Sequence, residues 1–256
     1  MKWQGSGPAA EGEMTSQSRI EWTENTWNPV TGCTKISSGC KNCYALDMSR
    51  RLKAMGAAGY ENGFRVTTHS ERLRDPTRRR KPTTYFVNSM SDLFQEEIGF
   101  EFIDAVFETI SACPQHTFQI LTKRAGRMNE YAASRDIPRN AWLGVSVENR
   151  RHGVPRIEIL RSAKVAVRFL SVEPLLEDLG PLRLNGISWV IVGGESGPRA
   201  RPMKPEWVRS IREQCSRDEI PFFFKQWGTH GPDGIRRSKR SNGRHLDGQT
   251  WDALPA

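Results

Sequence analysis

The sequence predicts an α/β fold with mostly parallel strands, arranged as a partial (β/α) barrel. From residue 84 onward, short apolar runs alternate with polar or amphipathic stretches. Each run is rich in β-branched or aromatic residues and apolar throughout, which is typical of a parallel strand buried on both faces. Alternation of such strands with helices predicts a parallel sheet. The six runs lie at 84–90, 117–122, 141–147, 166–172, 187–193 and 221–225.

Apolar residues at helical spacing predict four helices around these strands. The four sets are Ala45, Met48, Leu52 and Met55; Ile98, Phe102, Val106 and Ile110; Val154, Ile157 and Leu160; and Trp207, Ile211 and Cys215. Pro205 favours the first turn of the last helix. The stretch 173–186 is punctuated by Pro and Gly and is weak as a helix.

The barrel domain is predicted over residues 19–228, with 19–22 as a candidate further strand. A closed barrel of eight strands would need one or two more than these, so a partial barrel is favoured and a doubly wound open sheet is the alternative. Residues 1–18 are rich in Gly, Ser, Ala and Glu and predict a disordered lead-in. Residues 229–256 predict a separately held, Gly-rich and basic C-terminal tail.

The 256 residues carry a formal net charge of +9. A basic balance favours polyanionic partners, although solubility alone explains a charge of this size about as well. Arginines crowd two segments, which predicts DNA or RNA binding through Arg78, Arg79, Arg80, Arg236 and Arg237. The sequence contains neither a run of about eighteen apolar residues nor a secretory signal, so we expect no membrane partner and a cytoplasmic location.

Polar residues gather where the predicted strands end. The carboxyl-end rim of a barrel is where active sites are built, so six such ends favour a functional rim over ordinary loop polarity. The rim residues are Ser89, Ser91 and Asp92; Thr122, Lys123 and Arg124; Ser146, Glu148 and Asn149; Ser171 and Glu173; Gly193, Gly194, Glu195 and Ser196; and Lys225, Gln226 and Trp227.

Three of the five cysteines lie close together, as Cys33-x6-Cys40-x2-Cys43. In a reducing compartment, closely spaced thiols bind metal or do redox chemistry more often than they form disulfides. A structural zinc needs four ligands, and no second Cys pair or nearby His supplies the fourth. Three thiolates suit an iron–sulfur cluster that leaves one iron open, so we rank that cluster above zinc. Cys113 and Cys215 are interpreted as buried structural residues.

The segment 31–45 resembles the cysteine loop of a phage-encoded, radical-SAM-like family known as three-Cys-motif proteins. Its first spacer is three residues longer than the usual radical SAM C-x3-C-x2-C. Further segments resemble the same family, at 88–95, 120–124, 144–149, 168–176, 191–203, 222–228 and 243–255. The family is similar to the spore photoproduct lyase branch of radical SAM enzymes, whose strand-end motifs match Ser91, Asp92, Phe94 and Gln95, and Thr122 and Lys123.

The resemblance implies a partial barrel of the radical SAM type and a [4Fe–4S] cluster on Cys33, Cys40 and Cys43. It also implies S-adenosyl-L-methionine, bound at the open iron through its amino and carboxylate groups. Lys123 is then predicted for the methionyl carboxylate, Ser146 for the ribose, and Gly193 and Gly194 for close backbone approach to the adenosyl group. The other candidate cofactor-binding residues are Ser89, Asp92, Glu148, Glu173 and Glu195.

The predicted function is that of a radical S-adenosylmethionine-type enzyme that forms a 5′-deoxyadenosyl radical, uses an external electron donor and has nucleic acid as a candidate substrate. Two alternatives stay open for individual residues: a tight turn for the glycine pair, and ion pairs with arginines for the carboxylates. The alternative for the whole chain is a non-catalytic phage accessory protein that binds nucleic acid and is stabilised by zinc or a cluster.

Overall fold

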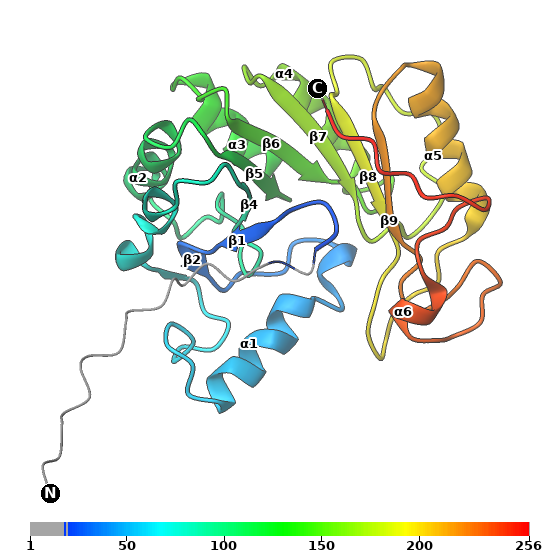
Figure 1. The fold of residues 1–256 in the computed structure, drawn as a ribbon, viewed down its shortest axis with the longest axis horizontal. Helices are drawn as coiled ribbons and strands as arrows, with labels where there is room; N and C mark the ends of the chain where they lie inside the picture. Colours follow the sequence, from blue (N-terminus) through cyan, green and yellow to red (C-terminus); the bar gives the residue numbers. More distant parts are fainter. Residues whose placement is uncertain (1–17, 19, 256) are drawn as a thin grey trace, which may run out of the picture.

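Seven strands form one parallel sheet in the part of the chain described by this computed structural model, residue 18 and residues 20–255. The strand order β1-β4-β5-β6-β7-β8-β9 follows the chain, with every neighbouring pair parallel (Figure 1). The strands are β1 (Asn25–Trp27), β4 (Thr84–Val87), β5 (Thr117–Thr122), β6 (Ala141–Ser146), β7 (Val167–Val172), β8 (Trp189–Gly193) and β9 (Phe222–Gln226). The predicted partial barrel is confirmed. The doubly wound alternative is wrong, because that fold needs a reversal in strand order.

The additional strand begins later than the predicted 19–22. Residues 20–24 form no strand, and β1 starts at Asn25. Trp22 instead packs its ring 4.7 Å from the ring of Phe86, inside the curve of the sheet. The predicted lead-in, 1–18, lies outside the described residues apart from Ser18.

Four helices pack against the outer face of the sheet. They are α2 (Phe100–Ser111), α3 (Ala125–Ala133), α4 (Val154–Ser162) and α5 (Pro205–Arg217). The predicted face of α2 is wrong in part, because Ile98 precedes the helix and Phe102 is half-buried. A period of 3.6 residues instead buries Ile103, Val106, Phe107 and Ile110. The helix α3 was not predicted, because its buried face consists of Ala125, Met128, Tyr131 and Ala132 and contains no Leu, Ile or Val.

Alternate strand residues face opposite sides of the sheet, and this separates two apolar clusters. In β4, Tyr85 and Val87 join the large core beneath the helices, whereas Phe86 joins an aromatic cluster on the concave side. That cluster also contains Phe169 and Trp189. The ring of Phe169 lies only 2.5 Å from where a Cβ of Gly144 would be, so this close packing requires glycine on β6.

The segment between β1 and β4 covers the carboxyl ends of the strands. Figure 1 shows the strand arrows pointing toward α1 (Tyr44–Ala54), which follows the cysteine loop. A short antiparallel pair, β2 (Val30–Thr31) and β3 (Thr67–Thr68), lies on either side of α1 in the chain. The same segment also contains three short 3-10 helices, η1 (Ser38–Cys40), η2 (Ser70–Arg72) and η3 (Asp75–Arg78).

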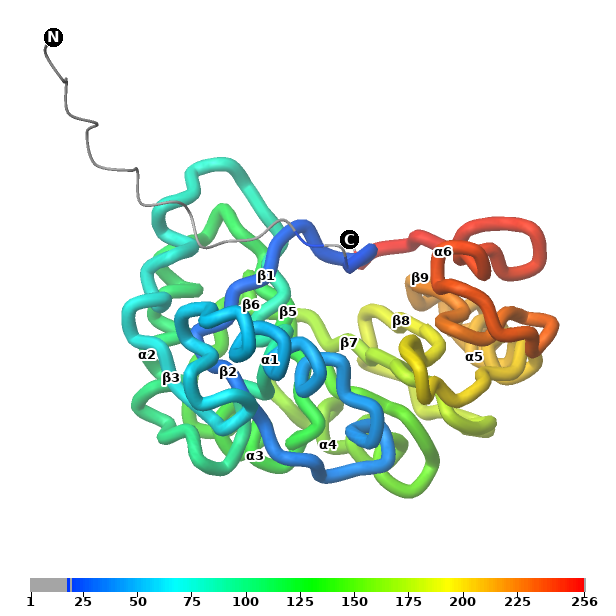
Figure 2. Tube along the Cα trace, turned by 90° about the horizontal axis from the view of Figure 1, so that it is seen from below, coloured from blue at the N-terminus to red at the C-terminus, as the bar shows by residue number. Residues whose placement is uncertain are grey.

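The C-terminal segment returns along the edge strand β9. It forms a short helix, α6 (Lys239–Asn242), then buries Leu246 and places Asp252 in an antiparallel bridge with Phe223. Lys239 also makes a 2.7 Å ion pair with Glu21, which precedes β1. Figure 2 shows β1 and β9 at opposite ends of the sheet. Among the described residues, no helix is long and apolar enough to cross a membrane.

Candidate functional site

A cavity of about 400 Å³ lies on the concave side at the carboxyl ends of the strands. Strand alternation explains which polar side chains enter it. Phe86, Leu121 and Phe169 face the concave side, so residues an even number of positions further along face the same way. The cavity-lining residues in this register are Asn88, Lys123, Ser146, Ser171, Glu173 and Lys225.

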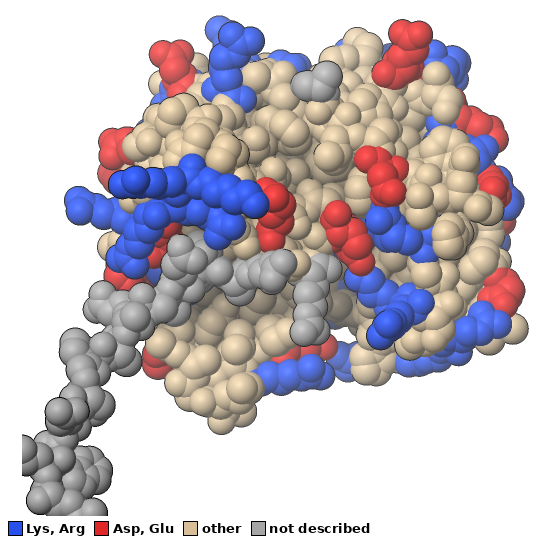
Figure 3. All heavy atoms as spheres, in the orientation of Figure 1, with Lys and Arg blue, Asp and Glu red and all other residues tan. Residues whose placement is uncertain are grey.

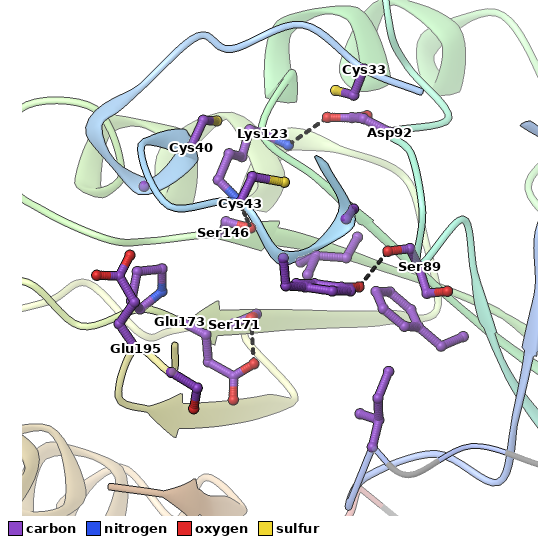
Figure 4. Close-up of a pocket in the computed structure, with 18 of the residues that line it drawn as sticks. Cys33, Cys40, Cys43, Ser89, Asp92, Lys123, Ser146, Ser171, Glu173 and Glu195 are labelled. Atoms are coloured by element: carbon purple, nitrogen blue, oxygen red, sulfur yellow. Dashed lines mark hydrogen bonds between the residues drawn. The ribbon is translucent and has the colours of Figure 1, made fainter. Parts of the chain in front are cut away.

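One side of the cavity is formed by Cys33, Cys40 and Cys43 together with the carboxylates of Asp92 and Glu195 (Figure 4). We name this side the cysteine wall. The three thiols are half-buried and free. Burial and the nearby Asp92 carboxylate raise the pKa of Cys33 to about 11. Burial also opposes ionisation of Cys40, but the Lys123 ammonium and backbone hydrogen bonds outweigh it and lower the pKa of that thiol.

Residues of the loops after β6 and β8 hold the cysteine loop in place. Asn149 donates to the Ser38 hydroxyl at 2.7 Å, and Arg201 donates to the Ser38 carbonyl at 3.0 Å. Asn42 donates to Glu195 at 3.0 Å and to the Arg199 carbonyl at 2.7 Å. Because the partners of the cysteine loop in these hydrogen bonds follow β6 and β8, the loop is fixed to the ends of two sheet strands.

Two carboxylates of the cysteine wall are fully engaged by protein donors. Asp92 accepts from the Thr122 hydroxyl at 2.6 Å and from the Lys123 backbone at 3.0 Å, and it pairs with Arg124 at 3.2 Å. Glu195 accepts from the backbone and guanidinium of Arg201 as well as from Asn42. Arg124 also donates to the Cys33 sulfur at 3.5 Å, which couples the end of β5 to the cysteine loop.

Lys123 remains available at the centre of the cavity. Its ammonium donates to the Ser146 hydroxyl at 3.1 Å and forms no ion pair with any residue of the described chain. Figure 4 shows Lys123 beside Cys40 and Cys43. A lysine without a counterion, next to three thiols, is suited to binding a carboxylate of a small molecule.

The opposite side of the cavity, which we name the acceptor wall, consists of Glu173, Lys225 and Gln226 from the ends of β7 and β9. Lys225 pairs with one oxygen of Glu173 at 3.0 Å. The other Glu173 oxygen and the Gln226 side-chain oxygen are buried without a hydrogen-bond partner in the described chain. An unpaired buried acceptor is costly, so these two atoms indicate a site for N–H or O–H groups of a ligand.

Three thiols line the cavity, and three thiolates are the donor set that an iron–sulfur cluster with one open iron takes. Within residue 18 and residues 20–255, no three His, Cys, Asp or Glu side chains are arranged to hold one ion. Thiolates on one tetrahedral zinc lie about 3.8 Å apart, since each Zn–S bond is about 2.3 Å. In a cluster each thiolate binds a different iron, which calls for a wider arrangement around a shared cavity. The three cysteines of this chain line such a shared cavity.

Residues 17–255 match the family described as "Protein of unknown function (DUF5131)". The chain belongs to this DUF5131 family. No curated protein matches it. The assignment to phage-encoded three-Cys-motif proteins stays a prediction.

Solved structures similar to the DUF5131 chain include several of spore photoproduct lyase. One is the lyase complexed with dinucleoside spore photoproduct, at 12% identity and a TM-score of 0.45. A mutant with bound AdoMet and dinucleoside spore photoproduct gives 13% and 0.48, and a Cys-to-Ser mutant gives 15% and 0.49. Each match covers 81% of this chain and 65% of the lyase chain, so the DUF5131 chain spans about two thirds of the lyase length. At this remote likeness nothing about activity follows.

Most predicted site residues of the DUF5131 chain line the one cavity. They are Cys33, Cys40, Cys43, Ser89, Asp92, Lys123, Ser146, Glu173, Gly194 and Glu195. Glu148 and Gly193 do not line it. Glu148 is fully buried in a 2.7 Å ion pair with Arg156, which is the arginine-pairing alternative left open by the sequence. Its Cγ lies 3.1 Å from where a Cβ of Gly39 would be, so Glu148 packs closely against the cysteine loop.

Three groups of cavity residues in the DUF5131 chain were not predicted as site residues. Trp22 and Phe86 form an aromatic wall, and Tyr44 lies at the start of α1 beside Cys43. Lys225 and Gln226 complete the acceptor wall. Lys225 is one of the residues identified from the sequence at the strand ends. Because alternate strand residues face the same side, its spacing of two from Phe223 could have placed it in the cavity.

Proposed function

We propose that this chain is a radical S-adenosylmethionine-type enzyme with a [4Fe–4S] cluster on Cys33, Cys40 and Cys43. The observation that carries the proposal is that these three cysteines line one cavity with an unpaired lysine, Lys123, at the carboxyl ends of a parallel partial barrel. When bound, such a cluster and S-adenosylmethionine supply a 5′-deoxyadenosyl radical that abstracts a hydrogen atom from a substrate.

The chain's own residues have distinct parts in this proposal. Lys123 would neutralise the methionyl carboxylate, and Ser146, which already accepts from Lys123, would position the ribose. Gly194 lines the cavity, but the backbone carbonyl of Trp227 occupies the space that its Cβ would take, so packing within the protein explains the glycine at this position. Asp92 and Glu195 would act indirectly, because their oxygens are engaged in holding the end of β5 and the cysteine loop.

The aromatic and acceptor walls would receive the substrate. Trp22 and Phe86 give a flat apolar surface that excludes water. Glu173 and Gln226 offer unpaired acceptors, and Lys225 lies 6.0 Å from the Trp22 ring. A substrate that presents N–H or O–H groups beside a planar apolar face would satisfy both walls.

We also propose an external electron donor and a nucleic-acid partner. The support for nucleic acid is charge: Arg78, Arg80, Arg236 and Arg237 are exposed and Arg79 is half-buried. Figure 3 shows Lys and Arg side chains gathered in patches on one face of the molecule. Such groups bind successive phosphates, with an affinity that falls steeply with salt.

Anaerobic reconstitution tests the cluster. We expect about four irons and four sulfides per chain, and loss of both in Cys33→Ala, Cys40→Ala or Cys43→Ala. Cys215→Ala is the matched control, because Cys215 is a fully buried thiol outside the cavity and should leave iron content unchanged. One zinc per chain without sulfide would contradict the proposal and favour a metal-stabilised binding protein.

The lysine is tested on the reconstituted protein. S-adenosylmethionine should change the electron paramagnetic resonance spectrum of the reduced cluster, and a strong reductant should then release 5′-deoxyadenosine. Lys123→Ala should weaken that spectral response while iron content stays at the wild-type level, since Lys123 is assigned to the small molecule and not to the metal.

A further inference from the structure

A second hollow lies on the outer side of the cysteine loop and is strongly basic. Lys35, Lys41, Arg50 and Arg199 line it, and Asp47 is its one acidic lining residue. We name it the basic groove. It shares Asn42 and Cys43 with the cavity, so the two hollows meet at the cysteine loop.

The positive charge of the basic groove is largely uncompensated. Asp47 lies 3.8 Å from Arg50. Lys35, Lys41 and Arg199 form no ion pair with any residue of the described chain, and all three are exposed. A hollow with several cations and one acid concentrates anions near it.

The groove is assembled from separate parts of the chain that the protein holds together. Lys35 and Lys41 come from the cysteine loop, Arg50 from α1, and Arg199 from the loop after β8. Asn42 bridges two of these parts by donating to the Arg199 carbonyl at 2.7 Å, and Lys35 donates to the Lys41 carbonyl at 3.3 Å. The cations therefore have fixed neighbours, unlike a run of charges along one exposed helix.

The groove leads to an aromatic surface. Tyr44 follows the shared residues Asn42 and Cys43 directly, lines the cavity and is 58% exposed. Trp22 and Phe86 lie deeper in the same cavity. A basic groove that continues onto aromatic side chains is the arrangement with which proteins bind single-stranded nucleic acid, phosphates on the cations and bases on the rings.

We propose that the basic groove binds the backbone phosphates of a nucleic-acid strand and directs one of its nucleotides into the cavity. The inference rests on the proposed function, because it assigns the substrate of that cavity. Arg236 extends the path, since it donates to the carbonyl of Pro198, next to Arg199.

Binding is measured on the full chain without cluster, by fluorescence anisotropy of a labelled single-stranded 12-nucleotide DNA and the matching RNA. The double variant Lys41→Gln/Arg199→Gln should bind at least about tenfold more weakly at 0.1 M salt and show a salt slope lower by about 1.4, since each phosphate contact to a single strand contributes about 0.7. The matched control Lys164→Gln/Arg183→Gln removes two exposed charges before β7 and β8, at the amino ends of the strands, and should bind within about twofold of wild type.

Three results would overturn the inference: equal weakening in the control, unchanged binding in the groove variant, or competition by polyglutamate as effective as by the oligonucleotide. The last would indicate a groove for acidic protein segments. Iron content of reconstituted wild type and groove variant is measured separately. If wild type binds the strand normally but takes up no iron, the proposed enzyme function is wrong and the proposed role of the groove stands. If wild type takes up iron normally but does not bind the strand, the role of the groove is wrong and the enzyme proposal stands.

Discussion

The cysteine wall and the acceptor wall face each other across one cavity, but the oxygens of their buried polar side chains differ in hydrogen bonding. On the cysteine wall, both oxygens of Asp92 and of Glu195 accept hydrogen bonds from protein donors. On the acceptor wall, one Glu173 oxygen and the Gln226 oxygen have no partner in the described chain.

This difference in hydrogen bonding distinguishes residues that position the cysteine loop from residues that can bind a ligand. A buried carboxylate with all its partners inside the protein stabilises local geometry and has little capacity left for a ligand. A buried acceptor without a partner costs stability unless something else binds it. We therefore assign loop positioning to the acids of the cysteine wall, and recognition of a ligand to the acceptor wall. Mutations should then affect folding on the first wall and binding on the second.

The largest effect is expected at Glu148, behind the cysteine loop. Its ion pair with Arg156 is buried, so Glu148→Ala leaves a charged guanidinium with one backbone partner, the Ser146 carbonyl. We expect a loss of about 3–5 kcal/mol in the free energy of unfolding, measured by urea denaturation. Glu158→Ala is the control. It breaks a 2.7 Å ion pair with Arg161 in which the Glu158 side chain is 63% exposed, and it should cost less than about 1 kcal/mol. Similar losses in both variants would remove the distinction.

A smaller, pH-dependent effect is expected at Glu195. Burial raises the pKa of this carboxyl, but hydrogen bonds from Arg201 and Asn42 outweigh it and lower the pKa below its ordinary value of 4.5. A lowered folded-state pKa adds stability above the unfolded-state pKa, and this stability is lost as pH falls through the folded-state value. Glu195→Gln should therefore cost about 1–3 kcal/mol at pH 7 and progressively less below about pH 4.

Urea unfolding at pH 7, 5 and 3.5 measures this dependence. Glu213→Gln is the control, because its side chain is 68% exposed and pairs with Arg212 only at 3.5 Å. Trypsin gives a second reading: release of Asn42 should speed cleavage after Lys35 and Lys41 in Glu195→Gln. A cost for Glu195→Gln that does not change with pH would show that the charge of Glu195 does not hold the loop.

Much of the fold could be predicted from local pattern. Six strands and four helices follow from apolar runs and helical spacing, because both features are repeated over several residues. The parts that could not be predicted are short or contain weak helix formers. β1 has three residues, and α3 is a nine-residue helix with a glycine and an asparagine.

The site was partly predictable for a different reason. Polar residues at strand ends must share one edge of a parallel sheet, and that brought Lys123, Ser146 and Glu173 together correctly. Their partners could not be read from the sequence. Glu173 meets Lys225 across 52 positions, and Glu195 meets Asn42 across 153. Only folding decides which acids are saturated by such contacts, as with Glu148, and which stay available.

The smallest effect on stability is expected at Gln226, and it tests the acceptor wall directly. Its amide makes only long hydrogen bonds, 3.3 Å to the Ser196 hydroxyl and 3.5 Å to the Gly194 carbonyl, while its oxygen is buried and unpaired. Gln226→Leu removes both the weak bonds and the unpaired acceptor, so the free energy of unfolding should change by less than about 1 kcal/mol.

Gln214 is the matched comparison for Gln226. The two glutamines are almost equally buried, at 8% and 7% exposed, but Gln214 accepts from the Leu182 backbone at 2.7 Å and donates to the Gly180 carbonyl. Gln214→Leu leaves that backbone N–H unpaired and should cost about 1–3 kcal/mol in the same urea titration. If Gln226→Leu proves as costly as Gln214→Leu, Gln226 belongs to the folding machinery. If it is neutral, Gln226 is not needed for stability, and binding a ligand is the role that its unpaired oxygen in the described chain indicates.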